Sequence, residues 1–169
     1  MDETLLNAAK RAVQSLKKRN LTLSSAESCT AGMISMALCA ASDDGVPYAS
    51  GFITYDDRAK NQLLHVSADT LTKFTAVSAE TVKEMAQGAC EVAGTDTGVS
   101  VSGYAGPEGG KDGTPAGTVW FGWYLGPGSQ QQEVRHFDGD CEAVILQASI
   151  FALERLASQV EELPDKFSK

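Results

Sequence analysis

The order of its helical and strand-like segments restricts the fold of this chain more than any other feature. Stretches rich in β-branched or aromatic residues predict strands at 21–25, 48–57, 97–102, 118–125 and 132–137. Apolar residues at helical spacing predict helices at about 5–20, 30–41, 58–66, 67–74, 79–93 and 141–160. Helices separate most strands, but only the turn "GPGS" joins the last two. We therefore expect a compact α/β/α sandwich with a mixed, partly antiparallel sheet.

Several helix ends are marked in the sequence. Ser78 and Asp140 are suited to cap the helices that follow them, and Gly94 lies just past the end of the helix at 79–93. We find no internal repeat, low-complexity tract or linker. The sequence predicts a single domain over 1–169, with a core at about 5–160 and a polar tail at 161–169.

The charge balance argues against several classes of partner. The chain has 22 acidic and 14 basic residues, a net charge of -8 and a pI near 4.7. Such a chain repels phosphate backbones and anionic lipid, so we expect neither nucleic acid nor a membrane as partner. The sequence has no apolar run of roughly 18 residues and no uncharged apolar block typical of a signal peptide. We expect a cytoplasmic protein.

Neither the thiols nor the histidines predict a metal site. The four cysteines, Cys29, Cys39, Cys90 and Cys141, form no C-x-x-C pair. His65 and His136 lie far apart, without carboxylates or thiols at ligand spacing. The glycine-rich stretch 103–117 departs from a Walker loop at Ala105 and Asp112. We expect reduced thiols, no metal and no cofactor.

A serine and a lysine remain as a possible nucleophile and base. Ser28, in "SSAESCTAGM", lies where a strand turns into a helix, whose free N–H groups could stabilise an oxyanion. Spacing alone favours the alternative, in which Ser28 or Thr30 only caps the helix. Lys60 could be a base if burial lowers its pKa, or a surface residue. Ser102, at the end of a strand, could bind a substrate or be only a strand-end hydroxyl.

Five stretches, in order, resemble the C-terminal domain of the competence-damage-inducible protein CinA. "AESCTAGM" is similar to the family's A-E-S-C-T-G-G, and "GFITYDDRAK" to its G-x-x-T-Y-x-x-x-x-K. "AVSAETVKEMAQGA" is similar to V-S-E-E-V-x-x-x-M-A-x-G-A, "SGYAGPEGG" to S-G-I-A-G-P-x-G-G, and "TPAGTVW" to K-P-V-G-T-V-W. The matches cover nearly the whole chain.

The resemblance implies an activity and the residues that perform it. Stand-alone members of the family hydrolyse the carboxamide of nicotinamide mononucleotide, giving nicotinate mononucleotide and ammonia without a metal, and tend to form homodimers. Carried over by position, Ser28 is the nucleophile and Lys60 its base, with Tyr55 and Ser102 as supporting polar groups. The expected substrate-binding residues are Thr30, Gly32, Gly103, Gly106, Gly109 and Gly110.

The sequence departs from the family pattern at the start of the last helix. The family's G-D-R-x-x-V-R is "GDCEAVI" here, so Cys141 and Ile145 replace two arginines suited to hold a phosphate. This leaves two interpretations. In the first, Lys111, Arg58 or Arg135 holds the phosphate, or the substrate is a pyridine carboxamide without a phosphate. In the second, the chain is an impaired paralogue that binds a ligand. A third possible class of function is non-enzymatic, a purely structural dimer. Ala31 replaces a glycine, which we expect a helix to tolerate.

Overall fold

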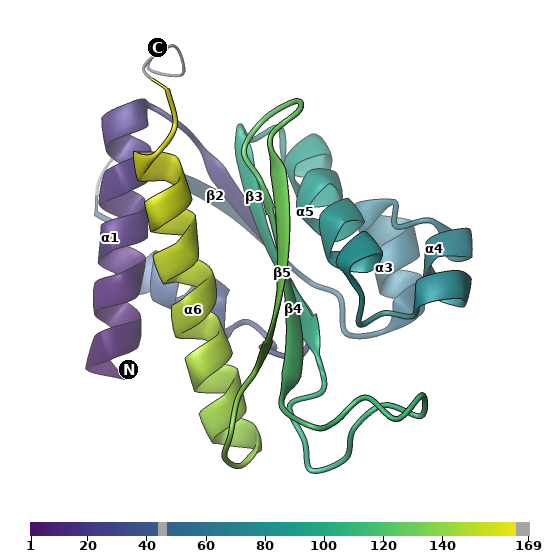
Figure 1. Cartoon of the computed structure of the whole chain (residues 1–169). Coiled ribbons are helices and arrows are strands. Elements are labelled where there is room, and N and C mark those ends of the chain that lie inside the picture. The colour runs from purple at the N-terminus through teal and green to yellow at the C-terminus, as the bar shows by residue number, and fades with distance from the viewer. Residues whose placement is uncertain (44–46, 165–169) are drawn as a thin grey trace.

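The computed structural model describes residues 1–43 and 47–164, which form three layers (Figure 1). The strands are β1 (Leu23–Glu27), β2 (Tyr48–Ile53), β3 (Thr97–Gly103), β4 (Thr118–Tyr124) and β5 (Gln130–His136). The helices are α1 (Glu3–Arg19), α2 (Met33–Ala40), α3 (Asp57–Leu64), α4 (Ala68–Phe74), α5 (Ala79–Ala93) and α6 (Cys141–Glu161). One face of the sheet is covered by α1, α2 and α6, and the other by α3, α4 and α5. The predicted α/β/α sandwich is confirmed.

The sheet is mixed, as the sequence predicts, and its strands have the order β2-β1-β3-β4-β5. β1 pairs in parallel with β2 and β3, whereas β4 is antiparallel to both β3 and β5. The chain leaves β1 toward α2 on one face and leaves β2 toward α3 on the other. In open α/β sheets such a divergence opens a crevice at the carboxyl ends of the strands, where ligands bind. This topology therefore places a candidate site after β1 and β2.

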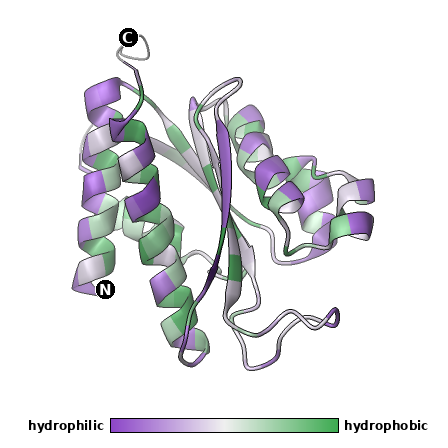
Figure 2. Ribbon diagram, viewed as in Figure 1, coloured by the Kyte–Doolittle hydropathy of each residue, from purple (hydrophilic) through white to green (hydrophobic). Residues whose placement is uncertain are grey.

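The larger of two apolar clusters lies between the sheet and the helices α1, α2 and α6. Inside it the indole N–H of Trp123 donates to the carbonyl of Ala152 over 3.1 Å, which ties β4 to α6. Figure 2 shows the apolar sides of α1 and α6 turned inward and a hydrophilic β5 at the sheet edge. The expectation of no apolar run of about 18 residues is wrong for α6, which is by length and composition apolar enough to cross a bilayer; half of that stretch is buried inside the molecule.

Local signals place most of the helix ends correctly. The side chains of Ser78 and Asp140 accept hydrogen bonds from N–H groups in the first turns of α5 and α6, and Gly94 ends α5 in a left-handed conformation. The helix predicted at 30–41 instead begins at Met33. At the other end of the chain Leu163 is buried in the core, so the polar tail starts later than position 161. Residues 165–169 of that tail lie outside the described residues.

We predict that Gly88→Ala destabilises the fold, although alanine normally favours a helix by about 1 kcal/mol over glycine. A Cβ atom at Gly88 would lie 1.9 Å from the carbonyl oxygen of Leu64, so α5 and α3 would have to separate. Overpacking of this kind costs about 1–3 kcal/mol. Denaturant unfolding measures the change. The exposed Lys83→Ala on the same helix is the control, and a Gly88→Ala protein as stable as that control would contradict the prediction.

Candidate active site

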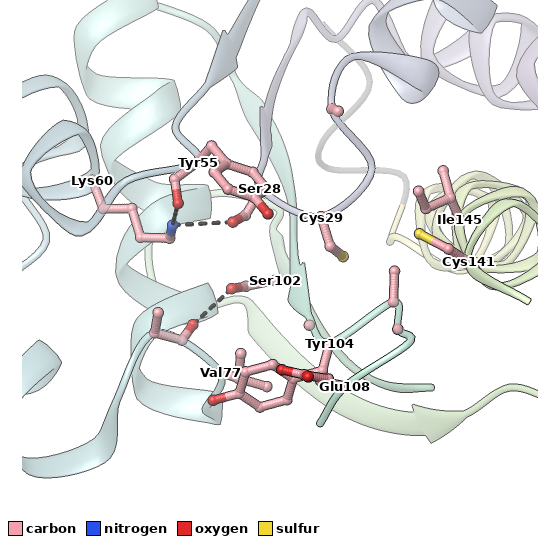
Figure 3. A pocket seen from close by; sticks show the side chains of 15 residues that line it. Ser28, Cys29, Tyr55, Lys60, Val77, Ser102, Tyr104, Glu108, Cys141 and Ile145 are labelled. Atoms are coloured by element: carbon pink, nitrogen blue, oxygen red, sulfur yellow. Dashed lines mark hydrogen bonds between the residues drawn. The ribbon is translucent and has the colours of Figure 1, made fainter. Parts of the chain in front are cut away.

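A cavity of about 460 Å³ lies at the carboxyl ends of the parallel strands. Ser28 follows β1, Tyr55 follows β2, Ser102 ends β3, and Lys60 enters from α3 (Figure 3). All four residues line this cavity, although they come from distant parts of the sequence. The structure thus brings together the residues that sequence reasoning assigned to catalysis.

Lys60 is fully buried, in contrast to the surface lysine that was the alternative. Its Nζ atom lies 3.1 Å from Ser28 Oγ, 2.6 Å from the carbonyl oxygen of Thr54 and 3.2 Å from that of Tyr55. Burial lowers the pKa of Lys60, because the charged ammonium loses its hydration. The two carbonyls are contacts that the sequence alone did not indicate.

The partners of Lys60 suit a neutral amine as well as an ammonium. The carbonyl oxygens of Thr54 and Tyr55 can only accept hydrogen bonds, whereas the Ser28 hydroxyl can either accept or donate. An ammonium would donate to all three. A neutral amine would donate to the two carbonyls and turn its lone pair to the hydroxyl proton of Ser28. Loss of one proton therefore converts Lys60 into an acceptor for Ser28 without any movement of the side chain.

Glu27 shapes the turn that carries Ser28. Its carboxylate is fully buried and accepts hydrogen bonds from the N–H groups of Gly32, Ile34 and Ser35 and from the hydroxyls of Thr30 and Ser35. A carboxylate at the amino end of α2 satisfies its free N–H groups and complements the helix dipole. Glu27, which sequence reasoning missed, therefore satisfies the N–H groups that a capping Ser28 or Thr30 was expected to satisfy.

Ser28 is consequently free of a capping role. Its N–H donates to the carbonyl of Val101 over 3.0 Å, which continues the β1–β3 pairing beyond β1, and its hydroxyl meets Lys60. The interpretation of Ser28 or Thr30 as a helix cap is wrong, because Gly32 occupies the N-cap position and the first N–H groups of α2 donate to Glu27. The N–H groups of Cys29 and Thr30 have no acceptor within the described residues. They remain available to a ligand.

Cys29 lines the same cavity, but its side chain points away from Lys60 (Figure 3). Burial raises the pKa of Cys29 to about 12, so the residue stays a protonated thiol at neutral pH. A thiol is a weak nucleophile compared with a thiolate. Ser28, which has a basic partner, is the better candidate of the two.

Tyr55 and Ser102 lie at opposite extremes of exposure. The Tyr55 side chain is 76% exposed at the rim of the cavity, and its carbonyl is the group that contacts Lys60. Ser102 is buried, and its hydroxyl donates to the carbonyl of Ala76 over 2.7 Å. Because that donor is engaged, Ser102 can offer a ligand only an acceptor.

The glycines expected to bind substrate divide into two groups. Gly103 and Gly106 line the cavity, whereas Gly109, Gly110 and Gly32 do not. A Cβ atom at Gly109 would lie 2.2 Å from the carbonyl oxygen of Thr114, so that glycine serves the packing of its own loop. Thr30 likewise lies outside the lining and holds Glu27.

The remaining walls of the cavity differ sharply in charge. Cys141 and Ile145, from the first turns of α6, form a neutral wall (Figure 3). Glu108, together with Tyr104 from the β3–β4 loop, lines another wall and was not singled out by the sequence. Within the described lining, Lys60 is the one basic residue and Glu108 the one acidic residue.

The three cations considered for a phosphate do not line the cavity. Arg58 is highly exposed and lies 3.7 Å from Asp56, whereas Arg135 pairs with Glu133. Lys111 lies on the exposed part of the glycine-rich loop. Across residues 1–43 and 47–164, no three His, Cys, Asp or Glu side chains cluster as ligands for a metal ion.

The fold and this site define a CinA-like α/β protein with a serine–lysine pair at the carboxyl edge of its sheet. Residues 6–160 match the CinA C-terminal domain, and the chain belongs to that family. Protein YdeJ of Escherichia coli K12 is 47% identical over 154 residues, covering 91% of this chain and 89% of YdeJ.

Two further relatives extend the comparison. The nicotinamide-nucleotide amidohydrolase PncC of Enterobacter agglomerans is 45% identical over 139 residues, covering 82% of this chain and 85% of PncC. The crystal structure of competence damage-inducible protein A (ComA) from Klebsiella pneumoniae has a TM-score of 0.91 at 42% identity, covering 95% of this chain and 99% of that one.

We predict that Ala31→Gly stabilises the fold. The expectation that a helix accommodates Ala31 is wrong: the residue precedes α2 and has a left-handed φ of 49°. That conformation costs a residue with a Cβ atom roughly 1–2 kcal/mol, and the backbone entropy of glycine offsets part of the gain. We expect the free energy of unfolding, measured by thermal unfolding, to rise by about 0.5–1 kcal/mol. Ala40→Gly, inside α2, should have the opposite effect, and equal signs would refute the prediction.

Proposed function

We propose that this chain is an amidohydrolase that converts a nicotinamide nucleotide or nucleoside to the corresponding nicotinate compound and ammonia. The sequence expectation for its substrate is nicotinamide mononucleotide, and the relative named PncC supports that substrate class. The observation that carries the proposal is the buried Nζ atom of Lys60, 3.1 Å from Ser28 Oγ on the wall of a cavity. A cytoplasmic location and a homodimer are part of the same proposal.

In the proposed reaction, neutral Lys60 takes the proton of the Ser28 hydroxyl while Ser28 Oγ bonds to the carboxamide carbon. Lys60 then gives that proton to the amide nitrogen, the C–N bond breaks, and ammonia leaves. Water attacks the resulting ester, with Lys60 again accepting the proton and returning it to Ser28. The carboxylate product leaves, and the acid proton passes to solvent.

The oxyanion formed at each step needs donors close to Ser28. The N–H groups of Cys29 and Thr30 are adjacent in sequence and have no protein acceptor within the described residues. Removal of one preorganised oxyanion donor costs about 2.7–4 kcal/mol in related chemistry. Because Glu27 fixes the turn through five hydrogen bonds, these donors would need little rearrangement.

A pyridinium substrate would assist its own hydrolysis. Its positive charge withdraws electrons from the carboxamide carbon and makes that carbon easier to attack. The same charge disfavours a nearby ammonium, so substrate binding should lower the pKa of Lys60 further. The pyridinium class of substrate thus suits a lysine base better than a neutral amide would.

A second candidate function is supported by the neutral wall of α6. Cys141 and Ile145 line the cavity and provide no charged donor for a phosphate. A paralogue could therefore retain Ser28 and Lys60 while binding a pyridine nucleotide or related ligand without turnover. Ammonia release by the wild type would exclude this alternative.

We predict that Ser28→Ala abolishes ammonia release and that Lys60→Arg does the same with the positive charge retained, since a guanidinium cannot accept the proton. Ammonia is measured with nicotinamide mononucleotide and nicotinamide riboside, and thermal unfolding verifies that each variant is folded. Cys39→Ala, which removes an exposed thiol elsewhere, is the matched control. Full turnover by folded Ser28→Ala would refute the nucleophile.

We predict that kcat/KM rises with pH through one ionisation below the ordinary pKa of lysine. The folded protein loses the Lys60 proton at lower pH than the unfolded chain, because burial lowers this pKa. The active neutral form therefore accumulates as pH rises through the folded pKa. The free energy of unfolding should rise in the same window, relative to Lys60→Met, up to the unfolded lysine pKa. A kcat/KM that falls with rising pH in this window would contradict Lys60 as the base.

A further inference from the structure

The two charged residues of the cavity are not equally available to a ligand. The Nζ atom of Lys60 is buried and already contacts Ser28 and the carbonyls of Thr54 and Tyr55. Glu108 lies on the exposed part of its loop and forms no ion pair within the described residues. A ligand in the cavity therefore meets one free charge, and that charge is negative.

This arrangement suits a cationic ring. A pyridinium would be attracted to the Glu108 carboxylate and to the faces of the nearby tyrosine rings, Tyr104 and Tyr55, which also line the cavity. Because Glu108 is exposed, water screens the attraction and its contribution to binding is modest. The preference should appear as a severalfold discrimination between charged and neutral rings.

The same arrangement is poor for a phosphate, which carries nearly two negative charges at neutral pH. The Nζ atom of Lys60 has no hydrogen-bond donor left for a phosphate, because its three contacts are already made within the protein. The wall of Cys141 and Ile145 has no charged donor. The amino end of α6 already holds a carboxylate, since Asp140 Oδ1 accepts a hydrogen bond from the N–H of Ala143 over 2.9 Å. An anion there would be repelled by Asp140 as well as by Glu108.

Room for a neutral substituent lies next to the site. A second cavity of about 470 Å³ shares Ala105, Gly106 and Cys141 with the first. It is lined largely by small residues, and Asp140 supplies the one charged side chain of its described lining. Small residues leave backbone groups accessible, and these, with a carboxylate, are suitable partners for sugar hydroxyls.

We propose that the cavity selects pyridinium carboxamides whose ring nitrogen carries an uncharged, hydroxyl-bearing substituent, so that nucleosides are preferred to their 5′-phosphates. The inference rests on the proposed function, which sets the reaction, and adds the class of substrate. The carboxamide would lie toward Ser28 and the ring toward Glu108. The sugar would extend along α6 into the second cavity.

Binding tests the preference separately from turnover. Dissociation constants of nicotinamide riboside and nicotinamide mononucleotide are measured by calorimetry on Ser28→Ala, which cannot consume them. We expect the riboside to bind about tenfold more tightly, because the phosphate meets no cation. Equal affinity, or tighter binding of the mononucleotide, would overturn the inference. Ammonia release by the wild type tests the proposed function, so failure of the reaction and failure of the preference give different results.

Variants of the two walls test the cause. Cys141→Arg/Ile145→Arg should shift the affinity ratio toward the mononucleotide by about a hundredfold or more, through two charged hydrogen bonds. Glu108→Gln should weaken the riboside about three- to tenfold and leave neutral nicotinamide unchanged. Lys111→Ala, outside the cavity lining, should change neither the affinity ratio of riboside to mononucleotide nor that of riboside to nicotinamide. A selective loss of mononucleotide binding in Lys111→Ala would instead identify Lys111 as a phosphate ligand and overturn the inference.

Discussion

The burial of Lys60 is the constraint on which the rest of the site depends. An ammonium without a carboxylate partner loses several kcal/mol of hydration when it is buried, so the fold must provide acceptors or remove the proton. It does both: the carbonyls that follow β2 accept hydrogen bonds from Nζ, and burial lowers the pKa of Lys60. Thr54 can supply its carbonyl because its N–H pairs with the carbonyl of Glu27 over 2.8 Å, beyond the end of β2. Sheet pairing thus positions Lys60, the proposed base.

Ser28, the proposed nucleophile, is positioned by an independent interaction on the neighbouring strand. The N–H of Ser28 continues the pairing of β1 with β3, while the carboxylate of Glu27 gathers the donors of the turn and of α2. The consecutive residues Glu27 and Ser28 therefore have different roles. The Glu27 side chain is buried against the amino end of α2, and Ser28 faces the cavity. Because strand side chains alternate between faces, a strand end is a place where adjacent residues can serve a helix cap and a reaction centre.

The fold was predictable where the sequence pattern is local. Hydrophobic periodicity and caps such as Ser78 and Asp140 predicted the elements and their succession along the chain, but not the order of the strands in the sheet. The short turn after β4 indicated the antiparallel part of the sheet. The motifs also located Ser28 and Lys60. The sequence could not reveal that backbone carbonyls hold Lys60 or that Glu108 faces the cavity, because these contacts depend on how the strand ends and loops are placed in space. The start of α2 was misjudged because the cap is Glu27, six residues before the first helical residue.

In the proposed function, different parts of the site would carry out the reaction and recognise the substrate. Ser28 and the donors of the turn follow β1 and Lys60 lies on α3, whereas the walls that meet the rest of a ligand come from the β3–β4 loop and from α6. In the proposed function, exchanges at Cys141 and Ile145 would therefore alter which substituent is accepted without touching the hydrogen bonds around Lys60. The negative charge of Glu108 and Asp140 acts in the same direction, since it favours a cationic ring and disfavours an anionic tail. Under the proposed function, a chain could thus keep Ser28 and Lys60 and change its substrate through the first turns of one helix.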